Sequence, residues 1–455
     1  MDNNIKVVKD ARELGILRII ILGWQTVFAI FGATVLVAMI TGLSVQVTLI
    51  CAGIGTLGAH LITGHKVPLF LGSSFAFLGG YASVMALDTG IYANMSQSEK
   101  LQYASGGAVV AGSLYLILAA IIAVIGVKRV MKYLHPVVTG TIILCIGLSL
   151  LPSAASNIST SPLIAIVALC VVIYFNIWGK GMFRIVPILM AVIVSYIVAL
   201  ILQFTGAIEP IIDLTAIHNA AWIGLPDMFP FAFDGNHLAK FDLTAIFAMA
   251  PNAIPTMMEH IGDMLALGAV TGSNYVLVPG LARTLMADGL MTMLAAVILG
   301  PPNTSYGEST SVTAMSKVHD PLIQEIAACF TILLGFSPKL ACIISTMPPA
   351  IVGGISFILY GMISTIGLRN IIENRVDFNR PRNIVICSLI LGMSIGYQNG
   401  LTITIAGIEI TLTGLALGAA IGLIANAVLP GNDYEFGKIP KGDQNRGIHI
   451  SNEDI

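Results

Sequence analysis

Residues 67 to 75, Val-Pro-Leu-Phe-Leu-Gly-Ser-Ser-Phe, and residues 300 to 308, Gly-Pro-Pro-Asn-Thr-Ser-Tyr-Gly-Glu, decide the fold. Both stretches lie within apolar sequence, but neither is typical of a transmembrane helix, because proline and glycine interrupt helices. Extended backbone at membrane depth leaves amides unpaired unless it is buried in protein or lines a polar cavity. Paired interruptions at matching positions of two halves indicate a transporter site near the bilayer midplane. The alternative interpretation is a pair of irregular loops at the membrane surface.

The surrounding sequence is that of an integral membrane protein. Its 455 residues are 56% hydrophobic and only 10% charged, with a mean hydropathy of +0.89. Because one span needs about 20 apolar residues, the length accommodates fourteen spans with short loops. We predict an all-α polytopic fold with spans near residues 19–40, 45–62, 67–86, 105–126, 135–151, 162–178, 185–204, 243–268, 281–299, 301–316, 322–336, 340–366, 382–397 and 408–429.

The two interruptions fall in spans three and ten, seven apart, which predicts two inverted seven-span repeats. Each short extended segment should be followed by a half-helix whose first amides have no internal partner and so present hydrogen-bond donors. In the last span, Gly414, Gly418 and Gly422 recur every four residues, a spacing that predicts close helix packing.

Basic residues collect on one side of this layout, as the positive-inside rule requires. Of 22 lysines and arginines, only Lys100, Lys240 and Lys339 fall in outer loops. This bias predicts a multi-pass protein of the cytoplasmic (inner) membrane with both termini cytoplasmic. The net charge of −2 gives no reason to expect a nucleic-acid partner, so the expected surroundings are the lipid bilayer.

Acidic residues interrupt two of the predicted spans. Glu259 and Asp263 interrupt span eight, and Glu308 opens the half-helix of span ten. Such residues are costly in a bilayer and usually mark a substrate or proton path. Glu259 and Asp263 are four apart and share a helix face, so their repulsion favours proton uptake during the cycle. His260, about 100° away on that helix, is interpreted as structural, and Asp288 in span nine as a helix-packing residue.

Five segments carry a resemblance to a known family. FAIFGATVLV (28–37), VPLFLGSSFAF (67–77), EHIGD (259–263), PNTSYGES (302–309) and GGISFILYG (353–361) resemble the nucleobase:cation symporter-2, or nucleobase-ascorbate transporter, family, which includes the uracil permeases. The match runs in register from about residue 15 to 429, and the combination of PNT-x-YGE with GSSFAF is specific.

The resemblance implies a core domain and a gate domain. Spans one to four and eight to eleven would form the core, and spans five to seven with twelve to fourteen the gate. The expected divisions are an N-terminal tail (1–18), core (19–134), gate (135–242), core (243–338), gate (339–429) and a C-terminal tail (430–455). The resemblance also implies proton symport of uracil, with the proton as coupling ion and no other cofactor, and a possible homodimer through the gate domain.

The resemblance also assigns roles within the site. Glu259 and Glu308 would accept the ring N–H groups of uracil, while the backbone amides of Phe75 and Gly307 would donate to its carbonyl oxygens. Proton coupling would fall to Glu259, Glu308 and Asp263. The residues expected to line the pocket are Ala33, Ser74, Tyr306 and Tyr360.

Two departures from the family pattern bear on the substrate. Asp263 stands where some uracil carriers have a histidine, and it resembles the acid found in purine carriers. In the first span, Thr26 stands where many family members have a histidine. Glu308, where purine carriers commonly have an amide, favours a pyrimidine. The alternatives are a xanthine or other purine symporter, and an anion exchanger or channel of the same fold. No nucleophile-base pair or metal-spaced cluster favours an enzyme.

Overall fold

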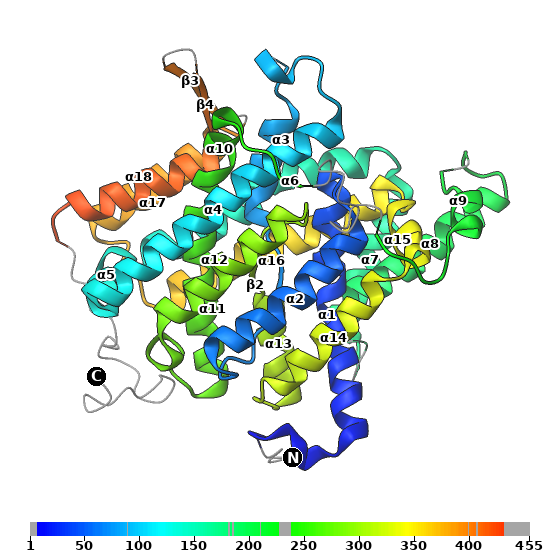
Figure 1. The fold of residues 1–455 in the computed structure, drawn as a ribbon, viewed down its shortest axis with the longest axis horizontal. Coiled ribbons are helices and arrows are strands. Elements are labelled where there is room, and N and C mark those ends of the chain that lie inside the picture. The colour runs from blue at the N-terminus through cyan, green and yellow to red at the C-terminus, as the bar shows by residue number, and fades with distance from the viewer. Residues whose placement is uncertain are drawn as a thin grey trace.

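The structure is a computed structural model that describes residues 7–88, 90–180, 183, 186–209, 211–226, 238–398, 400–405 and 408–431. Helices dominate the described chain, and they pack around two short crossing strands (Figure 1). Residues 1–6 and 432–455, which include most of the predicted C-terminal tail, lie outside the described residues.

The first half of the chain contains the elements up to α9. They are η1 (Ala11–Leu14), α1 (Ile16–Thr41), α2 (Val45–Thr63), β1 (Leu71–Ser73), η2 (Phe75–Phe77), α3 (Leu78–Met85), η3 (Gly90–Tyr92), α4 (Gln97–Ile125), α5 (Val127–Tyr133), α6 (Pro136–Ser159), α7 (Pro162–Trp178), α8 (Pro187–Phe204) and α9 (Leu214–Asn219).

The second half of the chain contains the elements from α10 onward. Its elements are α10 (Leu243–Met249), η5 (Ala250–Asn252), α11 (Ala253–Thr271), η6 (Val276–Gly280), α12 (Leu281–Val297), β2 (Asn303–Ser305), α13 (Gly307–Ser316), α14 (Leu322–Gly335), α15 (Pro338–Ser345), α16 (Pro349–Glu373), α17 (Pro381–Gly396), β3 (Leu401–Ile405), β4 (Ile408–Leu412) and α18 (Gly414–Val428).

Membrane-spanning character is visible in the long helices. Within the described residues, seven helices are long and apolar enough to cross a membrane, or eight if the pair α14 and α15, bent by 82°, forms one span. The segment Phe75–Met85 and helices α7, α17 and α18 are shorter apolar helices. These features establish a multi-pass membrane protein.

The two predicted interruptions are extended and pair with each other. Strands β1 and β2 are antiparallel, and their central pair is Gly72 opposite Thr304. Two further backbone bonds lengthen the ladder, from the Ser74 amide to the Pro302 carbonyl at 2.9 Å and from the Tyr306 amide to the Phe70 carbonyl at 3.0 Å. Each strand therefore satisfies the backbone groups of the other. Figure 1 shows β2 at the centre of the molecule, with α3 and α13 on opposite sides of it.

Helix α2 holds both strands in place. The Thr56 hydroxyl accepts from the Leu71 amide at 2.9 Å and lies 3.2 Å from the Leu71 carbonyl. On the other strand, the Asn303 side-chain amide donates to the Cys51 carbonyl at 2.8 Å. Each strand of the crossing is thus attached to α2 by a hydrogen bond, β1 through Thr56 and β2 through Cys51.

Glycine allows close packing at the end of the chain, as predicted. A Cβ at Gly414, Gly418 or Gly422 would overlap atoms of α17 or of the residue that follows it. The prediction that this four-residue spacing serves helix packing is therefore confirmed.

Three segments differ from their predicted boundaries. The predicted span 340–366 divides at Pro348 and Pro349 into the short α15 and the longer α16, because proline favours a helix start and disfavours the helical conformation before it. The predicted span 408–429 is helical only from Gly414, because residues 408–412 form β4, which pairs with β3.

The third difference concerns the predicted N-terminal tail. The Val8 amide donates to the Lys317 carbonyl at 3.0 Å, and the Val8 carbonyl accepts from the His319 amide at 2.9 Å. The Ala11 amide donates to the Asp320 carboxylate at 2.6 Å. Residues 8–14 are therefore docked on the connection between α13 and α14.

The ring of Tyr306 packs against Gly72, so the crossing should not tolerate a side chain there. A Cβ at Gly72 would overlap the Tyr306 ring. We expect Gly72→Ala to destabilise the protein by about 1 to 3 kcal/mol, the usual cost of overpacking, and to lower the thermal unfolding midpoint in detergent. The matched control is Gly392→Ala in α17, where a Cβ meets no atom within 4 Å. Equal midpoints for the two variants would contradict this packing.

Candidate functional site

The half-helix α13 starts beside α11, and this contact brings the three predicted acidic residues together. Glu259 and Asp263 lie one turn apart on α11, and a Cβ at Gly307 would lie 3.1 Å from Asp263 Oδ1. Glu308 is the next residue, in the first turn of α13. The three carboxyl groups are close enough to interact electrostatically. The shared face predicted for Glu259 and Asp263 therefore points toward Glu308.

Several polar atoms around this point are buried without an intramolecular partner. Among the described residues, Glu259 Oε2, Asp263 Oδ2, Ser74 Oγ and the Tyr360 hydroxyl are buried and accept or donate no hydrogen bond. A buried polar group without a partner costs about 1 to 3 kcal/mol, so an orphaned group requires an explanation. This arrangement is suited to a polar ligand that carries both donors and acceptors.

A backbone donor stands at the start of each half-helix. Phe75 opens η2, which continues into α3, and Gly307 opens α13. The first amides of a helix have no intrahelical acceptor and carry partial positive charge. Both predicted amides are therefore at helix starts, directly beyond the strands that position them.

The aromatic and small residues that were expected to line the pocket are buried. The rings of Phe75 and Tyr360 meet edge to face, with centroids 5.9 Å apart. Ala33 is fully buried on α1, and the carbonyl of the following Thr34 accepts from the Ser73 hydroxyl at 3.1 Å. Tyr306 is engaged within the crossing, because its hydroxyl donates to the Ser73 carbonyl at 2.9 Å.

A buried network behind β2 was only partly visible in the sequence. His260 Nδ1 lies 2.8 Å from Asp288 Oδ2 and 2.7 Å from Ser305 Oγ, and its Nε2 lies 2.9 Å from Thr284 Oγ1. The Ser305 amide donates to Asp288 at 3.1 Å. His260 and Asp288 thus hold the strand that leads into α13. The sequence offered one signal for this network, the cost of placing the ionisable Asp288 inside a span. It did not identify the partners of Asp288, which lie on β2 and α11.

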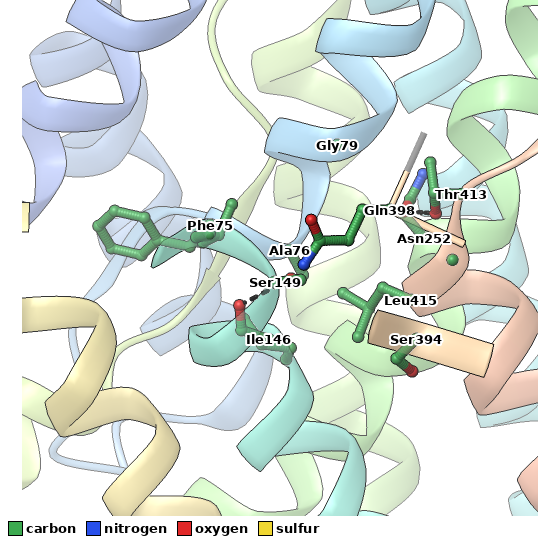
Figure 2. A pocket seen from close by; sticks show the side chains of 12 residues that line it. Phe75, Ala76, Gly79, Ile146, Ser149, Asn252, Ser394, Gln398, Thr413 and Leu415 are labelled. Atoms are coloured by element: carbon green, nitrogen blue, oxygen red, sulfur yellow. Dashed lines mark hydrogen bonds between the residues drawn. The ribbon is translucent and has the colours of Figure 1, made fainter. Parts of the chain in front are cut away.

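A cavity opens beside Phe75 on the α3 side of the crossing. Figure 2 shows Gln398, Ser149 and Asn252 around it, with Thr413 donating to Asn252 at 2.8 Å. Its lining comes from η2, α3, α6, η5, α17 and α18, and its volume is about 420 Å3 with the open mouth included. Phe75 contacts this cavity, whereas Glu259, Asp263 and Glu308 do not line it. The sequence analysis did not identify this cavity, because its walls come from five separate parts of the chain.

Comparison with known proteins places the chain in a family. Residues 17–401 match the Permease family of xanthine and uracil permeases. The uracil permease of Bacillus caldolyticus is 36% identical over 441 residues, which cover 95% of this chain and 96% of the relative. The uracil permease of Bacillus subtilis (strain 168) is 35% identical, with 89% and 91% covered. The putative pyrimidine permease RutG of Escherichia coli (strain K12) is 32% identical, with 93% and 92% covered.

Solved structures share the fold at much lower identity. The transmembrane domain of the cyanobacterial bicarbonate transporter BicA superposes with a TM-score of 0.58 at 15% identity, covering 93% of this chain and 100% of that one. SLC26A9 gives a TM-score of 0.66 at 10% identity, covering 92% of this chain and 66% of that one. At these identities the likeness shows the fold alone. The chain is therefore a transporter rather than an enzyme, and it belongs to the xanthine/uracil permease family.

Proposed function

We propose that the chain imports uracil across the cytoplasmic membrane by proton symport. The observation that carries this proposal is the set of groups at the two half-helices. Glu308 follows the helix-start amide of Gly307 and interacts with Glu259, and the Phe75 amide opens the other half-helix. Uracil has two ring N–H donors and two carbonyl acceptors. Two carboxylates and two amides match this set, and hydrogen bonds to charged groups are worth about 1.5 to 3 kcal/mol each. The curated relatives named as uracil permeases support the same substrate.

Transport would proceed by movement of a core against a gate. In this scheme fourteen spans form two inverted repeats, with residues 19–134 and 243–338 as the core, 135–242 and 339–429 as the gate, and both termini cytoplasmic. The crossing of β1 and β2 supports the scheme, because it ties the two core segments into one body that carries the site. Such rocking around a fixed site is the common mode of inverted-repeat transporters.

Proton coupling follows from the number of carboxyl groups at the site. Glu259, Asp263 and Glu308 interact electrostatically, and like charges repel. Binding a proton reduces this repulsion, so the proton and uracil share the same loaded state. Asp263 is adjacent to the binding pair rather than part of it, and we assign it chiefly to coupling.

A purine substrate is the second candidate, and Asp263 favours it. A purine carries an additional N–H on its five-membered ring, and the unpartnered Asp263 Oδ2 supplies an additional acceptor beside Gly307. Glu308 favours the pyrimidine, because a carboxylate cannot donate to a purine ring nitrogen.

The direct test is labelled uracil uptake into proteoliposomes with an imposed inward proton gradient. Uptake that a protonophore abolishes and that excess unlabelled xanthine leaves unchanged is the expected result. Uptake that persists without the gradient would overturn symport. Xanthine uptake without uracil uptake by folded protein would transfer the proposal to a purine substrate.

The first variant addresses the binding role of Glu308. We expect Glu308→Gln to weaken uracil binding about tenfold to a hundredfold, because an amide replaces one charged acceptor and presents a donor toward a ring N–H. Equilibrium binding of labelled uracil measures the effect. Glu373→Gln is the matched control, because Glu373 is 57% exposed and pairs only with Arg369 on the surface. Wild-type affinity in Glu308→Gln would remove Glu308 from the site.

The second variant separates binding from coupling. We expect Asp263→Asn to retain most uracil binding and counterflow exchange but to lose gradient-driven accumulation, because a carboxamide cannot take up and release the proton. Both activities are measured in the same proteoliposomes. Equal loss of exchange and accumulation would contradict a separate coupling role for Asp263.

A further inference from the structure

Two histidines and a glutamate form a cluster away from the carboxyl groups of the site. His60 lies in the last turns of α2, His65 directly after that helix, and Glu325 in the first turn of α14. His60 Nδ1 is 3.1 Å and His65 Nδ1 is 2.6 Å from the same oxygen, Glu325 Oε1. The exposed fraction rises from 2% for His60 through 21% for Glu325 to 57% for His65. The cluster therefore connects a buried imidazole to the surface.

The contacts of His60 require a proton in this cluster. Its Nε2 lies 2.8 Å from the Leu69 carbonyl oxygen, which only accepts, so Nε2 carries a hydrogen. Its Nδ1 faces a carboxylate oxygen at hydrogen-bond distance, which is favourable only if Nδ1 or the carboxyl group also carries a hydrogen. A neutral imidazole beside an ionised Glu325 can make only one of the two bonds. Loss of one proton must therefore break a contact of His60.

The bond to Leu69 connects this cluster to the start of α13. The next residue, Phe70, receives a hydrogen bond at its carbonyl from the Tyr306 amide at 3.0 Å. The Phe70 amide donates to the Ser309 hydroxyl at 3.2 Å. Tyr306 and Ser309 flank Gly307 and Glu308 in sequence. Residue 70 thus attaches the segment held by His60 to the half-helix that carries the proposed binding residues.

Among the described residues, no other ionisable group hydrogen-bonds to His60. Lys66 follows His65 in the same loop and is exposed. Across a small cavity lined by His60 lie His260 and Asp288, which bond to each other and to Ser305. Glu325 and His65 are thus the ionisable groups in direct contact with the His60 ring.

We propose that His60 and Glu325 are positioning residues whose shared proton links cytoplasmic pH to uracil affinity. This inference rests on the proposed function for the identity of the substrate. With the proton present, His60 holds Leu69 and Glu325 together and fixes the start of α13. Loss of this proton at higher pH breaks one of the two bonds, and the start of α13 loosens. An alkaline cytoplasm therefore promotes uracil release on the inner side.

The variant Glu325→Gln tests the proton requirement itself. A glutamine side chain can donate an N–H to Nδ1 of a neutral His60, which leaves Nε2–H free to hold Leu69. The variant therefore keeps both contacts at every pH. We expect wild type and Glu325→Gln to bind uracil equally near pH 6, and wild type to bind about two- to tenfold more weakly above about pH 8, the effect of one hydrogen bond. Titration of the site carboxyl groups affects both proteins alike.

A control variant and a second measurement complete the experiment. His65→Gln retains the His60–Glu325 pair and should keep the wild-type pH profile; a flattened profile would identify His65 as the sensor and overturn the assignment to His60. The thermal unfolding midpoint provides a readout independent of uracil. Because loss of the shared proton breaks a contact of His60, the wild-type midpoint should fall relative to that of Glu325→Gln as the pH rises from about 6 to 8.

The outcomes separate the two proposals. Wild type that binds no uracil, with the expected difference in midpoints, would contradict the proposed function and leave the proton-dependent contact supported. Wild type that binds uracil, with affinity and midpoint profiles that coincide with those of Glu325→Gln, would overturn the inference and leave the proposed function intact.

Discussion

The backbone of a membrane protein has no water to bond with at mid-bilayer, and the architecture of this chain depends on that constraint. Helices satisfy it internally, but a site built from helix starts requires the chain to leave helical conformation inside the membrane. The ladder between β1 and β2 meets this requirement, because each extended segment supplies the partners of the other. Bonds from Thr56, Asn303 and Asp288 then attach the ladder to α2 and α12.

The candidate site follows from this crossing. Each strand leads directly into a helix, so the antiparallel pair places the starts of η2 and α13 at opposite ends of one short ladder. Helix α11 runs beside α13 and adds Glu259 and Asp263 there. The positions of the Phe75 and Gly307 amides are thus fixed by the backbone at the helix starts. The positions of Glu259 and Asp263 are fixed by the packing of α11. A ligand with alternating donors and acceptors suits this combination better than a purely anionic one.

The parts of the fold that depend on local chemistry could be predicted from the sequence. Proline and glycine in 67–75 and 300–308 indicated extended segments, and the spacing of Glu259 and Asp263 indicated a shared face. The pairing of the strands and the cavity beside Phe75 could not be predicted, because they join residues hundreds of positions apart. The bonds of His260 could not be predicted either, because its partners lie on α12 and β2. At residues 408–412 a local signal existed in the alternation of β-branched residues, but this stretch was interpreted as the start of the last span. Pro348 and Pro349 likewise marked a helix start within a predicted span.

The crossing also has a consequence for biosynthesis. Gly72 pairs with Thr304, and the two positions are separated by 304 − 72 = 232 residues. When β1 enters the membrane, β2 has not yet been synthesised. The backbone groups of β1 therefore lack their final partners while several intervening helices are translated. Contacts of such long sequence separation form late and slowly. The binding region is therefore among the last parts of the protein to assemble, and truncated chains that end before residue 303 contain one strand of the ladder without its partner.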